Sequence, residues 1–146
     1  MFQDFFRDKF QRDAAQTTQW IQLLEEKEDE ITPEMRLVVS KILNGHHIWN
    51  ARLRQVIPES ELSDLLPFIY WKQLLEANLR ETNAFLDDFS STEKVRYHDS
   101  EGVQLERLTI DLLFQLVQDN QFYRGQLTLL AQQLGWSIWD FSLYRN

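Results

Sequence analysis

The chain has 146 residues, 43% of them hydrophobic, and its 15 basic and 23 acidic residues give a net charge of −8. It contains no cysteine, which excludes a disulfide scaffold, a zinc ribbon, an iron–sulfur protein and thiol catalysis by the protein itself. The acidic balance repels a phosphate backbone, so nucleic acid is not an expected partner. A chain of this length buries enough surface for a self-sufficient core, and we expect one domain over residues 1–146.

Charged residues interrupt the first 30 residues, beginning with Asp4, Arg7 and Asp8. No uninterrupted apolar segment remains there for a signal peptide or a membrane span. We therefore expect a cytoplasmic, soluble protein that does not bind membranes.

Apolar residues recur every three or four positions from Phe2 to Leu24, which predicts a first helix. The acidic run 25–30 is expected to end this helix in solvent. The predicted buried stripe consists of Phe2, Phe5, Phe6, Phe10, Ala14, Thr17, Ile21 and Leu24.

A start signal for a second helix follows at Thr32, Pro33 and Glu34, and the helical period continues to about Val56. Gly45 costs about 1 kcal/mol in a helix interior, which predicts a close approach by a neighbouring helix or a large ring. The predicted inward stripe consists of Leu37, Val38, Lys41, Ile42, Gly45, Ile48, Trp49, Arg52, Leu53 and Val56.

Two prolines and two cap-like serines, Ser60 and Ser63, predict a connection over residues 57–67. A third helix is expected over residues 68–89. Its predicted stripe consists of Phe68, Trp71, Leu75, Leu79, Thr82, Leu86 and Phe89.

Residues 90–108 alternate between apolar and polar around a turn-rich tetrapeptide at 99–102, which predicts a short β-hairpin. Thr109 is expected to cap a fourth helix that Gly135 ends. Its predicted buried face consists of Leu112, Leu113, Leu116, Val117, Tyr123, Leu127, Leu130 and Leu134. The apolar tail 136–146 is expected to be ordered and to pack against the helices.

The sequence shows no nucleophile-elbow pattern and no glycine-rich phosphate loop. His46 and His47 are adjacent in a helix, so their rings point about 100° apart and cannot share one metal ion. At most one of the two faces inward. His98 is expected at the surface.

Lys41 and Asp119 are opposite charges that the helical period assigns to the inner sides of their helices. Gln115 precedes Asp119 by one turn and Tyr123 follows it by one turn. Because a buried charge persists only if it is paired or hydrogen-bonded, each of the two charges predicts the other as its partner.

Three segments carry a specific resemblance. Residues 113–126 read LFQLVQDNQFYRGQ and resemble the helix-four signature of the DinB/YfiT-like superfamily, roughly LFHVVNHxxYHRGQ. Residues 40–53 read SKILNGHHIWNARL and resemble the helix-two pattern SHILNAHHIWNxRI. The ending of the chain, with Gly135 and then WDFSLY at 139–144, is also similar to that of the superfamily.

The resemblance implies an all-α four-helix bundle of up-down-down-up order, with a short hairpin before helix four. In the superfamily one histidine of helix two and an HxxxH pair of helix four hold a divalent metal, and several members are thiol-dependent S-transferases, isomerases or hydrolases. The corresponding positions here are Lys41, Asp119 and Tyr123, none of them histidine. A lysine repels a metal cation and tyrosine is a poor ligand, so no metal cofactor is expected.

We expect an ammonium–carboxylate contact between Lys41 and Asp119, direct or through water, to replace that ion. Two alternatives are that Lys41 extends to the rim while Asp119 faces solvent, and that His46 or His47 forms a relocated metal site with Asp119.

The leading hypothesis is a metal-free DinB-like protein that binds a small molecule or a protein partner. The apolar residues of the tail and first helix suggest a homodimer, and the alternative is that they complete the core of a monomer. The alternative is a metal- or thiol-dependent transferase or hydrolase that uses Lys41 as a base or anchor, and a third possibility is a scaffold within a complex. No catalytic residue is assigned. The predicted pocket residues are Lys41, Trp49, Gln115, Asp119 and Tyr123.

Overall fold

The computed structural model describes residues 2–137, and this part of the chain contains four long α-helices and one antiparallel hairpin. The helices are α1 (Phe2–Glu26), α2 (Pro33–Leu53), α3 (Trp71–Asp87) and α4 (Thr109–Gln133). The hairpin strands β1 (Lys94–His98) and β2 (Gln104–Leu108) precede α4. Single 3₁₀ turns, η1 (Glu28–Glu30) and η2 (Phe68–Tyr70), precede α2 and α3.

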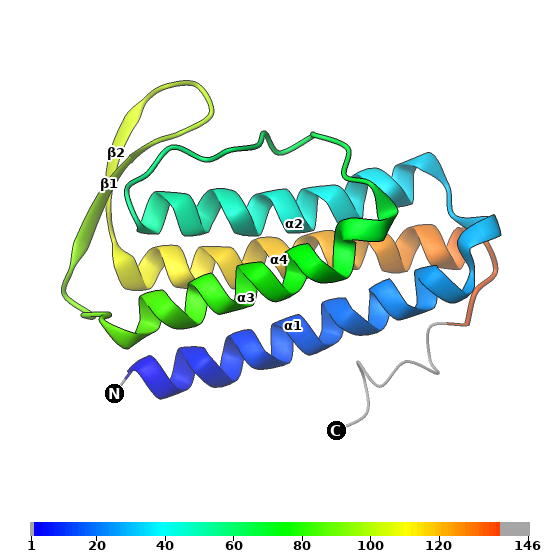
Figure 1. Cartoon of the computed structure of the whole chain (residues 1–146), viewed down its shortest axis with the longest axis horizontal. Helices are drawn as coiled ribbons and strands as arrows, with labels where there is room; N and C mark the ends of the chain where they lie inside the picture. Colours follow the sequence, from blue (N-terminus) through cyan, green and yellow to red (C-terminus); the bar gives the residue numbers. More distant parts are fainter. Residues whose placement is uncertain (1, 138–146) are drawn as a thin grey trace.

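The four helices lie lengthwise against one another, each packed on two neighbours (Figure 1). Helix α2 contacts α3 and α4, and α1 contacts the same two helices. Following the colours of Figure 1, α1 and α4 run in one direction, and α2 and α3 run in the other. The connection 54–67 returns along the length of α2 so that α3 can begin near the end where α2 begins. This long connection forms a wall over one face of α2.

The buried side chains form two apolar clusters. One contains Trp20, Leu24, Met35, Val39, Leu43, Trp71, Leu127 and other residues near the start of α2 and the end of α4. The other contains Phe6, Phe10, Leu53, Leu86, Val95, Leu113, Leu116 and their neighbours near the hairpin. All four helices also bury polar side chains, among them Asp13, Thr17, His46, Asn50, Thr82, Asn120 and Arg124.

The predicted helix boundaries are largely confirmed because they depend on local signals. Thr32 Oγ1 accepts a hydrogen bond from the backbone N–H of Met35 at 3.2 Å, which caps α2. Gly135 has φ +79°, a left-handed conformation that favours glycine and follows the end of α4. The predicted cap at Thr109 is wrong. Thr109 is already the first helical residue, and its backbone N–H bonds to the carbonyl of Glu93 instead.

Several predicted core positions lie at helix ends and are exposed. Phe2 and Phe5 belong to the first turn of α1, and Leu134 follows the last turn of α4. Val56, which the predicted stripe of the second helix also included, is exposed for a different reason. Helix α2 ends at Leu53, and Gln55 turns the chain with a φ of +58°, so the helical period no longer applies at Val56.

The hairpin closes one end of the helices and contacts α2 (Figure 1). Its register pairs Lys94 with Leu108 and His98 with Gln104. Asp99 stabilises the turn, because its Oδ1 accepts the backbone N–H groups of Glu101 and Val103 at 2.9 Å each. The turn therefore holds Asp99 beside β1.

Trp136 is buried at the other end, where its Nε1 donates to Glu30 Oε1 at 3.2 Å. The remainder of the predicted tail, residues 138–146, and with it the motif at 139–144, lies outside the described residues. Within residues 2–137, no helix combines the length and apolar character needed to cross a membrane.

Candidate functional site

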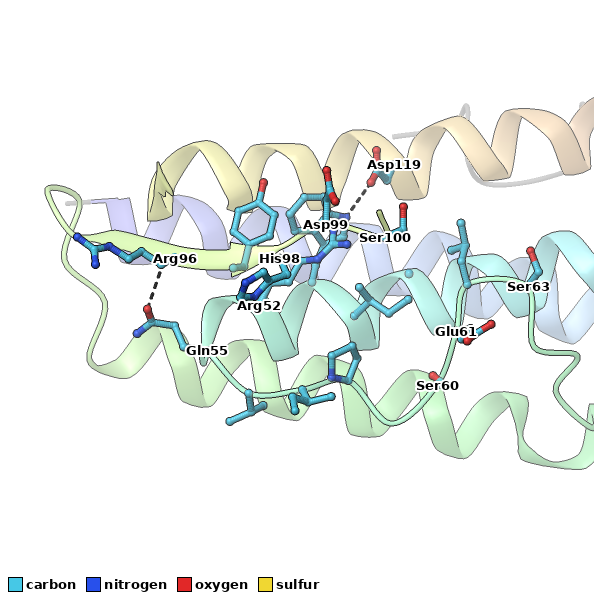
Figure 2. A pocket seen from close by; sticks show the side chains of 18 of the residues that line it. Arg52, Gln55, Ser60, Glu61, Ser63, Arg96, His98, Asp99, Ser100 and Asp119 are labelled. Atoms are coloured by element: carbon cyan, nitrogen blue, oxygen red, sulfur yellow. Dashed lines mark hydrogen bonds between the residues drawn. The ribbon is translucent and has the colours of Figure 1, made fainter. Parts of the chain in front are cut away.

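A pocket of about 760 Å³ lies between α2, the connection 54–67, the hairpin and α4. Figure 2 shows Arg52, His98, Asp99 and Asp119 near its centre and the serines of the connection at one end. The wall is mixed in character: α2 and the connection supply aliphatic side chains, while the hairpin and α4 supply polar ones. Its lining residues include Ile48, Trp49, Arg52, Val56, Ile57, Pro58, Leu62, Tyr97, Asp99, Asp119 and Tyr123.

Asp119 is held in place by two hydrogen bonds, one to each carboxylate oxygen. The indole Nε1 of Trp49 donates to Oδ2 at 2.8 Å, and Gln115 Nε2 donates to Oδ1 at 2.7 Å. Trp49 belongs to α2, whereas Gln115 and Asp119 are one turn apart on α4. The bond from Trp49 therefore links the two helices at the floor of the pocket (Figure 2).

The cation stacked on the aromatic rings of this site is Arg52, not Lys41; Arg96 also lines the pocket, but it is exposed and paired with Glu106. The guanidinium carbon of Arg52 lies 4.6 Å from the ring centroid of Trp49 and 5.2 Å from that of Tyr97. Such stacking orients the planar guanidinium and is worth about 0.5–2 kcal/mol. Burial lowers the pKa of Arg52, while the charges of Tyr97, Asp99 and Asp119 oppose that shift.

The predicted contact between Lys41 and Asp119 is wrong. Among the described residues Lys41 forms no ion pair, and it does not line the pocket. The reason is the register of α2 on α4, which places Trp49 against Asp119. Lys41 precedes Trp49 by eight residues, so at 1.5 Å per residue it lies about 12 Å further along the axis.

Of the five predicted pocket residues, the structure brings Trp49, Asp119 and Tyr123 together in the lining. Gln115 contacts the pocket only through Asp119. Tyr123 is partly buried, and burial followed by the negative charge of Asp119 raises the pKa of its hydroxyl. Tyr123 therefore presents a neutral O–H group at physiological pH.

The two adjacent histidines of α2 have different environments, as the sequence predicted. His46 is buried, and its Nε2 lies 2.8 Å from Thr82 Oγ1, which in turn donates to Asn50 Oδ1 at 2.8 Å. Burial, and to a lesser degree the charge of His47, lowers the pKa of His46 to about 3. His47 accepts the backbone N–H of Glu59 in the connection at 3.0 Å. His98 is exposed, as predicted, and it lines the pocket.

Gly45 lies where α2 faces the connection. A Cβ added to Gly45 would lie 3.5 Å from Leu62 Cδ1, an ordinary contact distance, and would meet no helix or ring. The predicted close approach by a helix or ring is therefore wrong, and Gly45 instead leaves space beneath the connection, where it lines the pocket.

A second pair of charges, which the sequence analysis did not identify, is buried between α1 and α4. Arg124 Nη1 lies 2.6 Å from Asp13 Oδ1 and donates to Thr17 Oγ1 at 3.0 Å. Asn120 Nδ2 donates to Asp13 Oδ2 at 2.8 Å. Burial raises the pKa of Asp13, although Arg124 and Asn120 oppose that shift. The helical period could have indicated Asp13, because it lies three residues after Phe10 and four before Thr17, both on the predicted buried stripe.

The positions that the resemblance assigns to a metal do not form a ligand set. Lys41 is outside the pocket, and both oxygens of Asp119 accept hydrogen bonds from protein donors. Across residues 2–137, no three histidine or acidic side chains are close enough to share a metal ion. These residues do not fit the divalent metal of the superfamily.

Comparisons of the chain with protein-family models, with curated proteins and with solved structures found no match. Membership of the DinB/YfiT-like superfamily accordingly stays a prediction from the sequence motifs.

Proposed function

We propose that the chain is a DinB-like four-helix bundle that binds a small organic molecule in the pocket over α2, without the divalent metal of the superfamily. The observation that carries this proposal is the fixed polar group at the pocket floor. Trp49, Asp119 and Arg52 are oriented by one another, yet they border a cavity of about 760 Å³ with an aliphatic wall. A concave, largely apolar pocket with a few oriented polar groups is typical of ligand sites.

The helix directions, the hairpin before α4 and the long connection between α2 and α3 support the DinB-like assignment. The proposal of a metal-independent site is supported by the donor set, since Asp119 is already hydrogen-bonded on both oxygens. A homodimer and a cytoplasmic location stay predictions from the sequence.

The proposal is tested by screening a library of small organic fragments by NMR. The signal to follow is the indole N–H of Trp49, because that proton is bonded to Asp119 at the pocket floor. The Trp49→Phe variant assigns this signal among those of the five tryptophans. We expect fragments with an aromatic or aliphatic body to shift it at millimolar concentration.

A matched pair of glycine variants places the binding event in the pocket. Gly45→Leu puts a side chain into the space below Leu62, whereas Gly125→Leu places the same side chain on α4 with no atom within 4 Å of its Cβ. Binding should be lost in the first variant and retained in the second. Fragments that bind Gly45→Leu as well as wild type, or a library in which nothing binds, would contradict the proposal.

Metal binding is tested separately, since it distinguishes the enzymatic alternative. The purified protein is incubated with Zn²⁺, Ni²⁺ and Mn²⁺ and analysed for bound metal, with thermal unfolding recorded in parallel. We expect neither stoichiometric metal nor a rise in the unfolding temperature. One equivalent of metal that is lost in Asp119→Asn would favour a metal-dependent transferase or hydrolase.

A further inference from the structure

The pocket contains a guanidinium whose hydrogen-bond donors have no acceptor among the residues that the structure describes. Arg52 is partly buried and stacked on Trp49 and Tyr97, but within residues 2–137 its side chain donates no hydrogen bond and forms no ion pair. The neighbouring Arg54 differs, because it pairs with Glu81 at 3.5 Å outside the pocket. An arginine presents five N–H donors in a planar fork, so Arg52 offers a ready site for an oxyanion.

The two acids near Arg52 are engaged by other donors. Asp119 accepts hydrogen bonds from Trp49 and Gln115, and Asp99 Oδ1 accepts two backbone N–H groups of its own turn. Within residues 2–137 neither acid forms a hydrogen bond or an ion pair with the guanidinium of Arg52. Their charges still matter, because two carboxylates in a partly buried pocket repel a ligand more strongly as its negative charge increases.

The connection supplies most of the aliphatic lining of the pocket, together with the polar residues Ser60, Glu61 and Ser63. Ile57 is 90% exposed and Leu62 is 37% exposed, although both line the pocket together with Ile48 and Pro58. Apolar side chains that line a cavity and remain exposed gain by covering an apolar ligand. Figure 2 shows Arg52 on α2 facing the pocket and the connection running along its side.

From these contacts we infer that the ligand is an organic monocarboxylate, whose carboxylate binds the fork of Arg52 and whose apolar body packs against the connection 54–67. A carboxylate matches the two parallel N–H groups of a guanidinium. A phosphate monoester matches them equally well but carries about two negative charges, which Asp99 and Asp119 disfavour. This inference rests on the proposed function, since it names the ligand class of the same pocket.

The test uses four six-carbon probes of similar size: hexanoate, hexanamide, hexyl phosphate and hexylamine. Each is titrated into the full chain while the Trp49 indole N–H signal is followed by NMR. We expect hexanoate to bind about tenfold more tightly than hexanamide, because hydrogen bonds to a charged group are stronger than neutral ones. Hexyl phosphate and hexylamine should bind more weakly than hexanoate.

Variants at Arg52 assign the effect to its guanidinium. In Arg52→Gln the affinity for hexanoate should fall by about tenfold, while the affinity for hexanamide should fall much less, because a neutral carbonyl gains less from the guanidinium than a carboxylate does. Arg52→Lys should recover only part of the loss, since an ammonium keeps the charge but not the fork. Arg54→Gln is the matched control and should bind both probes like wild type. Circular dichroism confirms that each variant is folded.

The outcomes separate this inference from the proposed function. Equal affinities for hexanoate and hexanamide, or hexanoate binding that survives Arg52→Gln, would overturn the inference and leave pocket binding intact. Tighter binding of hexyl phosphate would overturn the choice of a carboxylate. If none of the four probes, including neutral hexanamide, perturbs the pocket, and the fragment library also fails, the proposed function itself is wrong.

Discussion

Two regions of this protein place an arginine close to an aspartate, and they do so with opposite results. Between α1 and α4, Arg124 contacts Asp13 at 2.6 Å, and both side chains are buried. In the pocket, Arg52 lies near Asp119, yet the carboxylate accepts hydrogen bonds from Trp49 and Gln115 instead. A buried charge pair whose members are paired and hydrogen-bonded contributes to the fold, whereas a stacked arginine with unused donors is suited to binding.

The largest expected effect comes from breaking the buried pair. Arg124→Met leaves Asp13 buried with Asn120 as its remaining side-chain partner, and the free energy of unfolding should fall by about 3–5 kcal/mol. Urea denaturation measures the loss. The double variant Asp13→Leu with Arg124→Met should recover most of it, because no buried charge is then left alone. A loss below about 1 kcal/mol for the single variant would show that the pair is not structural.

The pH dependence of stability tests the buried histidine that lies on the inner side of α2. Burial lowers the pKa of His46 from its ordinary value of 6.5 to about 3 in the folded state, so below pH 6.5 the unfolded chain takes up a proton that the folded chain does not. Stability is therefore lost as pH falls from about 6.5 towards 3. Between pH 7 and pH 5 the neutral His46 of the folded state lowers the free energy of unfolding by about 2 kcal/mol.

His46→Gln removes the titrating group and keeps an amide within reach of Thr82, so it isolates this contribution. The difference in unfolding free energy between pH 7 and pH 5 should shrink by about 2 kcal/mol in the variant. Denaturation at both pH values provides the measurement. An unchanged pH dependence would mean that the pKa of His46 is the same in the folded and the unfolded chain.

The smallest expected effect tests the charge pair predicted from the sequence, Lys41 with Asp119, against the observed hydrogen bonds of Asp119 to Trp49 and Gln115. Lys41 is partly buried and unpaired within the described residues, so Lys41→Ala should change the free energy of unfolding by less than about 0.5 kcal/mol. It should also leave fragment binding to the pocket unchanged. A loss of several kcal/mol, with Asp119→Ala showing no additional loss in the double variant, would restore the pairing of Lys41 with Asp119.

Local signals were sufficient for the secondary structure. The cap at Thr32, the glycine at Gly135 and the turn at 99–102 act through the backbone within a few residues, so they can be recognised in the sequence. The division between buried His46 and half-buried His47 was also predictable, because adjacent helical residues point about 100° apart. The predicted cap at Thr109 is wrong because the helix begins one residue earlier than expected, so Thr109 is its first residue and Leu108 occupies the cap position without a side-chain hydrogen bond.

The candidate site was predictable only in part. The helical period placed Trp49 and Asp119 on inner faces, and Arg52 was on the same predicted stripe as Lys41. The helical period does not determine which residue of α2 lies opposite Asp119. The prediction named Lys41, whereas the structure places Trp49 against Asp119 and Arg52 in the lining of the pocket. The helical period also does not identify Arg124 as the partner of Asp13, because the two residues are 111 positions apart in the chain and meet only through helix packing.

The amino-acid order alone was enough to place the four helices, the hairpin and most of their ends, because those depend on interactions between near neighbours in the chain. Only the packing of the helices decided how far α2 is shifted along α4, and that shift put Trp49 rather than Lys41 against Asp119. Axial register depends on how many side chains fit together at once, and a periodic pattern is the same for every shift by a whole turn. For that reason the composition of the pocket had to come from the tertiary structure.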